Sequence, residues 1–537
     1  MSSKLLKGTA ILTIGLFLSK ALGLFYLIPF YAIVGAENIG LYQYGYIPYN
    51  IALSIAIGGA PLAISKFVAR YNALGDYATG RKILKGSMGI MVITGFASFL
   101  VLFFLAEPLA HLVIADDEET FTIEEISNVI RWASFALIAV PVMSVVRGFL
   151  QGYNKMEPTA VSQLIEQIVR IIVVLAGAFF VVNFLHESEK VAINFAVFAA
   201  TVGAVASLGV LYWYWRKYKP EFDYLLANSP PAGNVPVKDM VKEIITYIFP
   251  FVLVGVINPL YQFVDMITFN GAMQSIGISG KASNTYLGML NLLTHKFVMI
   301  PVMVATGFSM ALIPVLTGYF TKGDQKGITR SLDQTYQIMM YLTVPMVIGI
   351  SVLSNELYQL LYSKSEAGAS ILASYAPVAI LFGLYTVTAA ILQGIDRHKW
   401  IVFTSLFGLL LKLMINIPLI KLFETNGAIL ATSIGYAAAV GLNIAIITKT
   451  LHYRSKMVFR RLMLIGLLNL VMFIAVYLTL KGLNAFNPVG GKMHALLYIL
   501  ICAGVGVIVY GVLSLKTGLA QRLFGDRLKR ITAKFGL

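Results

Sequence analysis

The sequence is poor in charge and in cysteine, and each shortage excludes a class of protein. Only 12% of its 537 residues are charged, about half the share found in an ordinary soluble domain. Hydrophobic residues make up 58%, and they form long apolar runs from end to end. The single cysteine, Cys502, lies in one of these runs, so an internal disulfide is excluded. This composition is typical of a helical membrane protein with many spans.

Motifs for catalysis and for nucleotide hydrolysis are also missing. No HExxH or CxxC sequence occurs and the six histidines are scattered, so we expect no metal site. The nearest approach to a Walker A sequence, Gly280-Lys281-Ala282, lacks the Ser or Thr of that motif. No nucleophile and base stand together in the pattern of a catalytic site. We therefore expect no catalytic residues, no cofactor and no enzymatic activity.

The net charge of +16 would indicate nucleic-acid binding in a soluble protein, but here the bases have another explanation. They gather in alternate short loops between the apolar runs, and lysine and arginine mark the cytoplasmic side of membrane proteins. The other set of loops is poor in bases and includes the acidic segment 115–125. We expect a plasma-membrane protein with both termini in the cytoplasm and no nucleic-acid partner.

The apolar runs predict an all-α polytopic fold with fourteen membrane-spanning helices, each of about 20 residues or more. The first run continues too far to be a cleaved signal peptide, so we count it as a span. The predicted spans are roughly 8–34, 43–70, 83–108, 127–152, 158–184, 191–216, 243–270, 284–320, 329–354, 369–394, 399–422, 427–449, 458–481 and 492–515.

Two short patterns recur in the same order in the two halves of the chain. Leu150-Gln151-Gly152 ends the fourth predicted span, and Leu392-Gln393-Gly394 ends the tenth. A base follows each glutamine by nineteen residues, Arg170 in the first half and Lys412 in the second. Both copies lie on the predicted cytoplasmic side, so they indicate parallel repeats, a known plan of transporters.

The second pattern is a tyrosine followed by a Gly-Asp pair, and it helps to define the domains. It occurs after the second predicted span at Gly75-Asp76 and after the eighth at Gly323-Asp324. The repeats predict two lobes of six helices, a polar linker between them, and a final helix pair with a basic tail. These regions are residues 1–216, 243–450, 217–242 and 451–537, respectively.

Six charged residues fall deep within predicted spans, where a charge persists only beside a partner or an aqueous cavity. The bases are Lys20, Arg170, Lys296 and Lys412, and the acids are Glu166 and Asp265. No acid lies within one turn of Lys20 or Lys296 in the sequence, which favours a cavity for both. The i,i+4 spacing of Glu166 and Arg170 allows either pairing on one helix face or cavity lining. Lys412 is compatible with helix packing as well as with a cavity.

Asp265 lies nearer the outer end of the seventh span, after Asn258-Pro259, where we expect a break in the helix. It could pair with Lys296, bind a cation or face outer water. The excess of deep bases over deep acids predicts a positive interior that suits an anionic passenger such as a phosphate or pyrophosphate. We therefore predict that the four deep bases bind the substrate, and that Asp265 and Glu166 are ion-coupling residues or charge partners.

Two stretches carry a family resemblance. Ser19-Lys20-Ala21-Leu22-Gly23, followed by Gly35-Ala36, resembles the opening of the MurJ-type lipid II flippases, which belong to the multidrug/oligosaccharidyl-lipid/polysaccharide exporters. The eighth span is similar to the eighth helix of that family, through the run from Lys296 to Pro301, Gly307 and the run from Ala311 to Pro314. The resemblance covers essentially the whole chain.

The resemblance implies alternating access between two lobes, with the headgroup of a polyprenyl-pyrophosphate-linked saccharide crossing a cationic cavity and its tail lying along the last two helices. It assigns basic residues of the family to Lys20 and Lys296, and the family's sodium-site acid to Asp265. Two further family arginines fall near Tyr26 and Ser54, so only part of the cationic cluster carries over.

We therefore expect a flippase that moves lipid II from the inner to the outer leaflet, reset by the membrane potential or by a monovalent ion. Its partners would be this lipid-linked anion and the bilayer, and it would act as a monomer near cell-wall synthesis enzymes. The alternatives are a flippase for another polyprenyl-linked polysaccharide, a drug/cation antiporter, and, from another class, a membrane scaffold without transport. An antiporter for cations would more naturally have an excess of deep acids.

Overall fold

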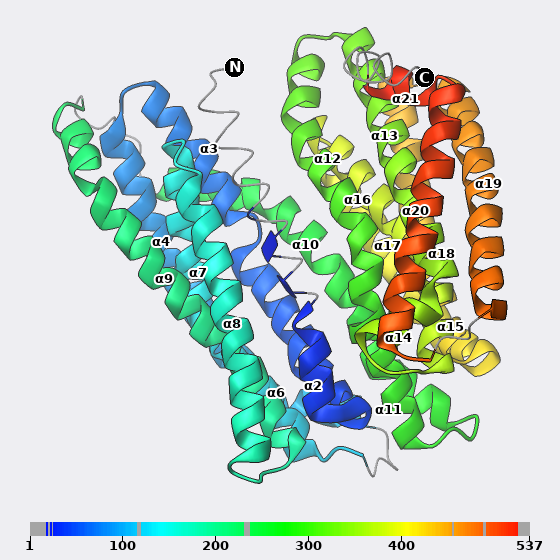
Figure 1. Ribbon diagram of the computed structural model, residues 1–537. Helices are drawn as coiled ribbons and strands as arrows, with labels where there is room; N and C mark the ends of the chain where they lie inside the picture. The colour runs from blue at the N-terminus through cyan, green and yellow to red at the C-terminus, as the bar shows by residue number, and fades with distance from the viewer. Residues whose placement is uncertain are drawn as a thin grey trace. The chain divides into compact units, whose positions relative to one another are not determined.

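The computed structural model describes residues 25–114, 120–229, 237–453, 456–486 and 490–524, with Gly15, Leu18, Ser19, Leu22 and Gly23 before them. The regular elements of those residues are helices (Figure 1). Twelve helical segments in this part of the chain are long and apolar enough to cross a membrane. Two of these, Leu27–Ala73 and His398–Leu451, hold 47 and 54 residues, enough for two crossings each. The all-α polytopic prediction is confirmed, and the structure is consistent with fourteen spans.

The chain forms two compact units, Met1–Gly288 and Met289–Leu537. The predicted lobe boundaries at 216 and 243 stay a prediction. The first unit contains α2 (Leu27–Ile57), α3 (Ala60–Ala73), α4 (Tyr77–Phe104), α5 (Ala106–Val113), α6 (Ile123–Ser134), α7 (Ala136–Gly152), α8 (Glu157–Asn183), α9 (Glu189–Ala227), α10 (Val237–Gln274) and α11 (Gly280–Gly288).

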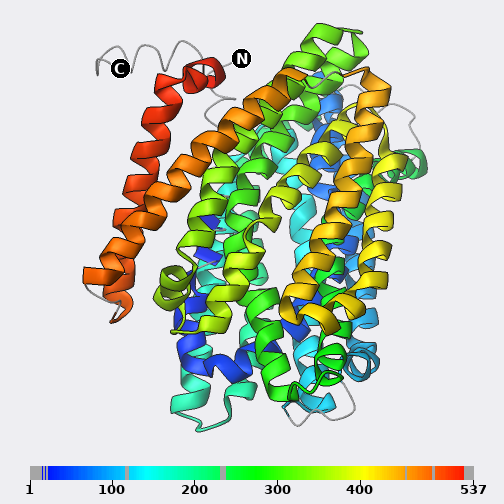
Figure 2. The same ribbon diagram turned by 90° about the vertical axis from the view of Figure 1, so that its right-hand side faces the viewer.

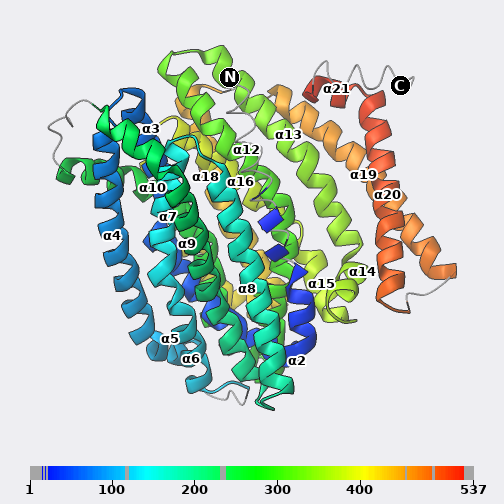
Figure 3. The ribbon, with the colours of Figure 1, turned by 60° about the vertical axis from the view of Figure 1, so that its left-hand side comes forward.

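Two glycines shape the first unit. Within α2, Gly35 has φ of 79° and ψ of 168°, which breaks the helical path one residue after the predicted end of the first span. This left-handed φ suits glycine, which has no Cβ. On α9, a Cβ at Gly203 would lie 2.7 Å from the Glu166 carbonyl oxygen and 3.3 Å from the Arg170 Cβ. Gly203 therefore permits the close packing of α8 and α9, which lie side by side (Figure 3).

The second unit begins with a π-helix, η1 (Met289–Thr294), which continues directly into α12. The elements after it are α12 (His295–Thr321), α13 (Gln325–Val352), α14 (Ser354–Leu361), α15 (Glu366–Tyr375), α16 (Val378–Gly394), α17 (His398–Phe423), α18 (Thr425–Leu451), α19 (Lys456–Phe486), α20 (Lys492–Lys516) and α21 (Leu519–Phe524). The pair α19–α20 runs side by side at one edge of this unit (Figure 2). It packs on α13 through a buried apolar cluster that includes Ile338, Met472 and Cys502.

Both sequence repeats have matching local structure. Gly75 and Gly323 have φ of 75° and 68°. The next residue caps the following helix in each copy: Asp76 accepts from the Thr79 N–H and Asp324 from the Gly327 N–H, both at 2.9 Å. The capped helices, α4 and α13, both have 28 residues. The helices that carry the Leu-Gln-Gly pattern, α7 and α16, both have 17 residues and end at its glycine.

Candidate functional site

The carboxylate of Glu166 on α8 forms an ion pair with Arg147 on α7. The Arg147 Nη2 lies 2.9 Å from the Glu166 Oε2, and only 8% of Arg147 is exposed. Arg147 also donates to the hydroxyls of Ser162 at 3.0 Å and Ser207 at 2.9 Å. One guanidinium therefore connects α7, α8 and α9. The ion pair of Glu166 with Arg147 is thus a contact between helices, and Glu166 also interacts electrostatically with Arg170, four residues later on α8.

Sequence reasoning missed Arg147. The residue lies within the fourth predicted span, 127–152, four positions before Gln151. Its place in an apolar run was the available signal, because a base at that depth needs a partner. Glu166 is that partner, so the first unit contains a buried ion pair in addition to the charges that the sequence singled out.

Arg170 lies beside a row of tyrosines on α2. Tyr42, Tyr46 and Tyr49 follow one another along this helix, with ring centroids 5.6 Å and 6.3 Å apart. The guanidinium interacts electrostatically with all three, and most strongly with Tyr49. The Tyr26 hydroxyl lies 3.2 Å from that of Tyr42, and the buried Nε of Arg170 has no hydrogen-bond partner. Arg170 also hydrogen-bonds Tyr49 and interacts with Glu166, so one cation and several hydroxyls lie together here.

Lys20 lies outside the described residues, but its neighbours Ser19 and Gly23 pack along α8, the helix that carries Arg170. The Ser19 hydroxyl is 3.5 Å from the Gln163 carbonyl oxygen. A Cβ at Gly23 would lie 3.2 Å from the Gln167 Nε2. Gln163 and Gln167 precede Arg170 by seven and three residues, so they lie on the same side of α8. Ser19 and Gly23 of the first predicted span therefore lie against the side of α8 that carries Arg170.

Lys296 is the second residue of α12, directly after the π-helix η1. π-Helical segments are rare in proteins, and those that do occur are often found at functional sites. The neighbouring His295 is buried, and its Nδ1 is 2.9 Å from the Tyr375 hydroxyl. Successive α-helical residues are about 100° apart around the axis, so Lys296 leaves α12 in a different direction from His295. The Lys296 side chain is half-buried.

Lys412 is fully buried, with 0% of its surface exposed. Its Nζ donates to the Thr432 hydroxyl at 2.6 Å, which joins α17 to α18. The same hydroxyl donates to the Ala428 carbonyl oxygen at 3.0 Å. Farther along these helices, Asn443 accepts from Thr404 at 2.6 Å and donates to Thr388 at 3.1 Å. The surroundings of Lys412 are polar and tightly packed, which favours the packing interpretation.

Asp265 is 4% exposed on α10. This helix is continuous through Pro259, so the expected break after Asn258 is wrong. Further along α10, Asn270 donates to the Tyr44 hydroxyl at 2.9 Å and to the Asn284 Oδ1 at 3.0 Å. These contacts join α10 to α2 and α11, because polar groups within an apolar interior seek one another.

Neither acid stands in a metal-binding cluster. Among the residues that the structure describes, no group of three or more His, Cys, Asp or Glu side chains could hold a metal ion. The arrangement around Arg170 is suited to binding an anion and hydroxyl groups, because guanidinium recognises phosphate oxygens bidentately.

Comparison of the whole sequence with known proteins identifies the family. The profile described as "Polysaccharide biosynthesis protein" matches residues 5–320, and the MatE profile matches residues 250–417. The lipid II flippase MurJ of Bacillus subtilis (strain 168) is 43% identical over 534 residues, which cover 98% of this chain and 98% of that protein. The chain belongs to the MurJ family.

The chain also matches a more distant sequence and two solved structures. Stage V sporulation protein B of Bacillus subtilis (strain 168) is 24% identical over 83% of this chain and 84% of that protein. A solved structure of lipid II flippase MurJ in an inward closed conformation covers 96% of this chain and 99% of that one, with a TM-score of 0.67 and 17% identity. An inward-facing multidrug resistance MATE transporter of the MOP superfamily has a TM-score of 0.63 at 14% identity and covers 80% and 94%. At these identities, the two structures show a shared fold.

Proposed function

We propose that this chain flips lipid II, the undecaprenyl-pyrophosphate-linked peptidoglycan precursor, from the inner to the outer leaflet of the plasma membrane. The observation that carries the proposal is the 43% identity to a lipid II flippase over 98% of both chains. Both termini would lie in the cytoplasm, since the basic loops face that side. The chain would act as a transporter without catalysis, as a monomer close to the enzymes that polymerise its product.

The pyrophosphate of the substrate gives the deep bases their role. Arg170 would contact phosphate oxygens as a planar donor, and Lys296 would act as a point charge. The resemblance places Tyr26 where the family has an arginine, and Arg170 interacts electrostatically with Tyr26. Arg170 would therefore supply the guanidinium that position 26 lacks. Lys20 would add a further charge, whereas the burial of Lys412 favours a role in packing.

Charge also supplies a direction for transport. An inside-negative membrane potential favours outward movement of an anion by about 2.3 kcal/mol per charge for each 100 mV. The same potential draws an empty, positively charged binding site back toward the cytoplasm. Asp265 is buried on α10, and it is our candidate for coupling this reset to a monovalent ion.

Replacing Lys296 tests the proposal in cells. Lys296→Ala should fail to support growth of a strain depleted of its own flippase, while its abundance in the membrane stays normal. Lys296→Arg keeps the charge and should retain part of the activity. Lys322→Ala is a matched control at the exposed end of α12, and it should behave as the unmodified protein. Full activity of Lys296→Ala would remove this residue from the pyrophosphate site.

A topological assay tests the substrate. Labelled lipid II on the cytoplasmic leaflet should become accessible outside only when the active chain is present. If lipid II stays inside while another polyprenyl-linked saccharide crosses, the substrate assignment fails. Cation-dependent drug efflux from everted vesicles, without lipid II movement, would favour the antiporter.

A further inference from the structure

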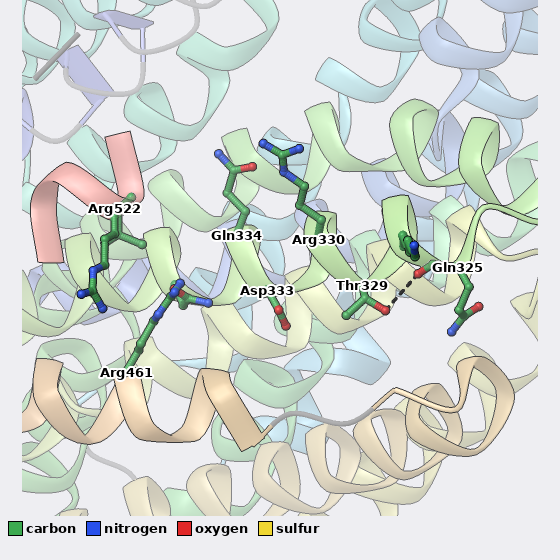
Figure 4. A pocket seen from close by; sticks show the side chains of 10 residues that line it. Gln325, Thr329, Arg330, Asp333, Gln334, Arg461 and Arg522 are labelled. Carbon is green, nitrogen blue, oxygen red and sulfur yellow. Dashed lines mark hydrogen bonds between the residues drawn. The ribbon is translucent and has the colours of Figure 1, made fainter. Parts of the chain in front are cut away.

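A basic pocket of about 620 Å³ lies within the second unit. It is formed by the first turns of α13, the beginning of α19 and the short helix α21. Four bases line it, Lys326 and Arg330 from α13, Arg461 from α19 and Arg522 from α21. Figure 4 shows three of these side chains, Arg330, Arg461 and Arg522, coming from three different helices. None of them belongs to the residues assigned to lipid II above.

One acid, Asp333, lines the same pocket, and its carboxylate is already engaged. The Tyr453 hydroxyl donates to the Asp333 Oδ1 at 2.5 Å. Burial and the neighbouring carboxylate both raise the pKa of Tyr453 above its usual range, so the phenol remains a donor at neutral pH. With four bases against one acid, the pocket carries an excess of positive charge that favours an anion.

A buried amide provides a second, independent observation. Gln337 lines the pocket and is only 1% exposed. Its Oε1 accepts from the Arg461 Nη1 at 2.6 Å, but its Nε2 has no hydrogen-bond partner. A buried donor left without an acceptor costs free energy, of the order of 1–3 kcal/mol. An oxygen-rich ligand would satisfy this donor and the guanidinium of Arg461 together.

We propose that this pocket binds a phosphate group at the membrane surface. Guanidinium side chains recognise phosphate by paired hydrogen bonds, and basic pockets between membrane helices bind anionic lipid headgroups. The exposed apolar side chains of Phe459 and Met463 lie on the opposite side of α19 from Arg461. This helix therefore separates the pocket from an apolar surface. The phosphate comes either from an anionic phospholipid or from a soluble phosphate compound.

The test uses the full-length protein, purified and reconstituted in phosphatidylcholine nanodiscs. Binding is measured in two arms, by native mass spectrometry with phosphatidylglycerol and by calorimetry with inorganic pyrophosphate. The double variant Arg330→Gln/Arg522→Gln removes two exposed pocket charges and should weaken binding about tenfold or more, since each surface base contributes about 1 kcal/mol. The matched control is Lys322→Gln/Arg460→Gln, which changes two exposed bases outside the pocket and should bind within about twofold of the unmodified protein.

The two arms identify the source of the phosphate. Variant-sensitive binding of phosphatidylglycerol assigns the pocket to a lipid, and variant-sensitive binding of pyrophosphate alone assigns it to a soluble compound. Absence of binding in both arms, or equal losses in the double variant and its control, overturns the proposal. Asp333→Asn gives an opposite test, because it removes the only acid named in the lining and should tighten binding about fivefold. If that variant does not bind more tightly, the proposal also fails, even where the double variant is unstable.

Discussion

Arg170 and Lys412 occupy equivalent positions in the two sequence repeats, but their surroundings differ. Arg170 is half-buried beside tyrosines of α2, with a buried Nε that has no hydrogen-bond partner. Lys412 is fully buried and donates to Thr432. The repeat therefore preserves a base at this place in both halves, while the side chains around that base differ.

The neighbouring charges differ in the same way. Arg147 lies four residues before Gln151, and the equivalent position before Gln393 is Ala389. Glu166 lies four residues before Arg170, and the equivalent position before Lys412 is Gly408. The ion pair of the first unit thus has no counterpart at these positions of the second. The ion pair with Arg147 holds Glu166 beside Arg170, whereas Lys412 donates to the hydroxyl of Thr432.

The largest expected effect is on the stability of the first unit. Arg147→Ala leaves the Glu166 carboxylate without its ion-pair partner, and breaking a buried pair costs about 3–5 kcal/mol. We expect a marked fall in the midpoint of unfolding, measured in detergent by intrinsic fluorescence. Arg147→Ala/Glu166→Ala should recover part of this loss. A double variant less stable than Arg147→Ala would contradict the pairing.

Arg170→Ala should have the next largest effect. We expect it to lower the rate of lipid II flipping and to leave the stability of the protein unchanged. Loss of charge-assisted hydrogen bonds to a phosphate costs about 1.5–3 kcal/mol each, which corresponds to a lipid II flipping rate about tenfold to a hundredfold lower. Arg170→Lys should restore part of the rate, since the charge is kept. Unfolding midpoints of both variants serve as the control. If the flipping rate of Arg170→Ala is unchanged, then Arg170, like Lys412, is not needed for substrate binding.

The aspartate caps should respond equally in both units. Asp76→Ala and Asp324→Ala each remove an acceptor from a helix N-terminus, and loss of such a cap costs about 1 kcal/mol. We expect similar decreases in stability for the two variants, measured in the same unfolding experiment. Asp→Asn at each position keeps an acceptor and is the control. A large difference between the two caps would show that the turns are alike in shape but not in energy.

Lys412→Met should have the smallest effect. It replaces a buried charge by an apolar side chain of similar length, which removes the cost of burying the ammonium group, while the Thr432 hydroxyl keeps its hydrogen bond to the Ala428 carbonyl. The rate of lipid II flipping should stay within about twofold of that of the unmodified protein, since we expect Lys412 to make no contact with the phosphate. If Lys412→Met loses transport as fully as Arg170→Ala, then Lys412 contributes to substrate binding despite its burial.

Much of the fold was predictable because it depends on local and periodic features. Apolar runs of sufficient length predicted the spans. The Gly-Asp pairs indicated a repeat, and the structure adds that both pairs form a turn with a left-handed glycine and an aspartate cap. The charged sites were less predictable. Spacing placed Glu166 beside Arg170, but its ion-pair partner Arg147 comes from another helix. Contacts between helices depend on packing that a single sequence does not encode locally.

Two other features also depended on their surroundings. The helix α10 continues through Pro259, because packing in a membrane helix can replace the hydrogen bond that proline removes. The π-helix η1 precedes Lys296 without a local marker in the sequence. Resemblance to a family added what periodicity did not supply, since it related Lys296 and Tyr26 to positions that bear charge in relatives.

Gly203 acts as a spacer of fixed width for the first unit. A single methyl group there would press on the backbone of Glu166 and on the Arg170 Cβ at once. The wedge would move the carboxylate away from Arg147 and the guanidinium away from the tyrosine row, although Gly203 itself contributes no side chain to either. The distance between α8 and α9 at the charged residues therefore depends on the absence of a Cβ at Gly203 on α9.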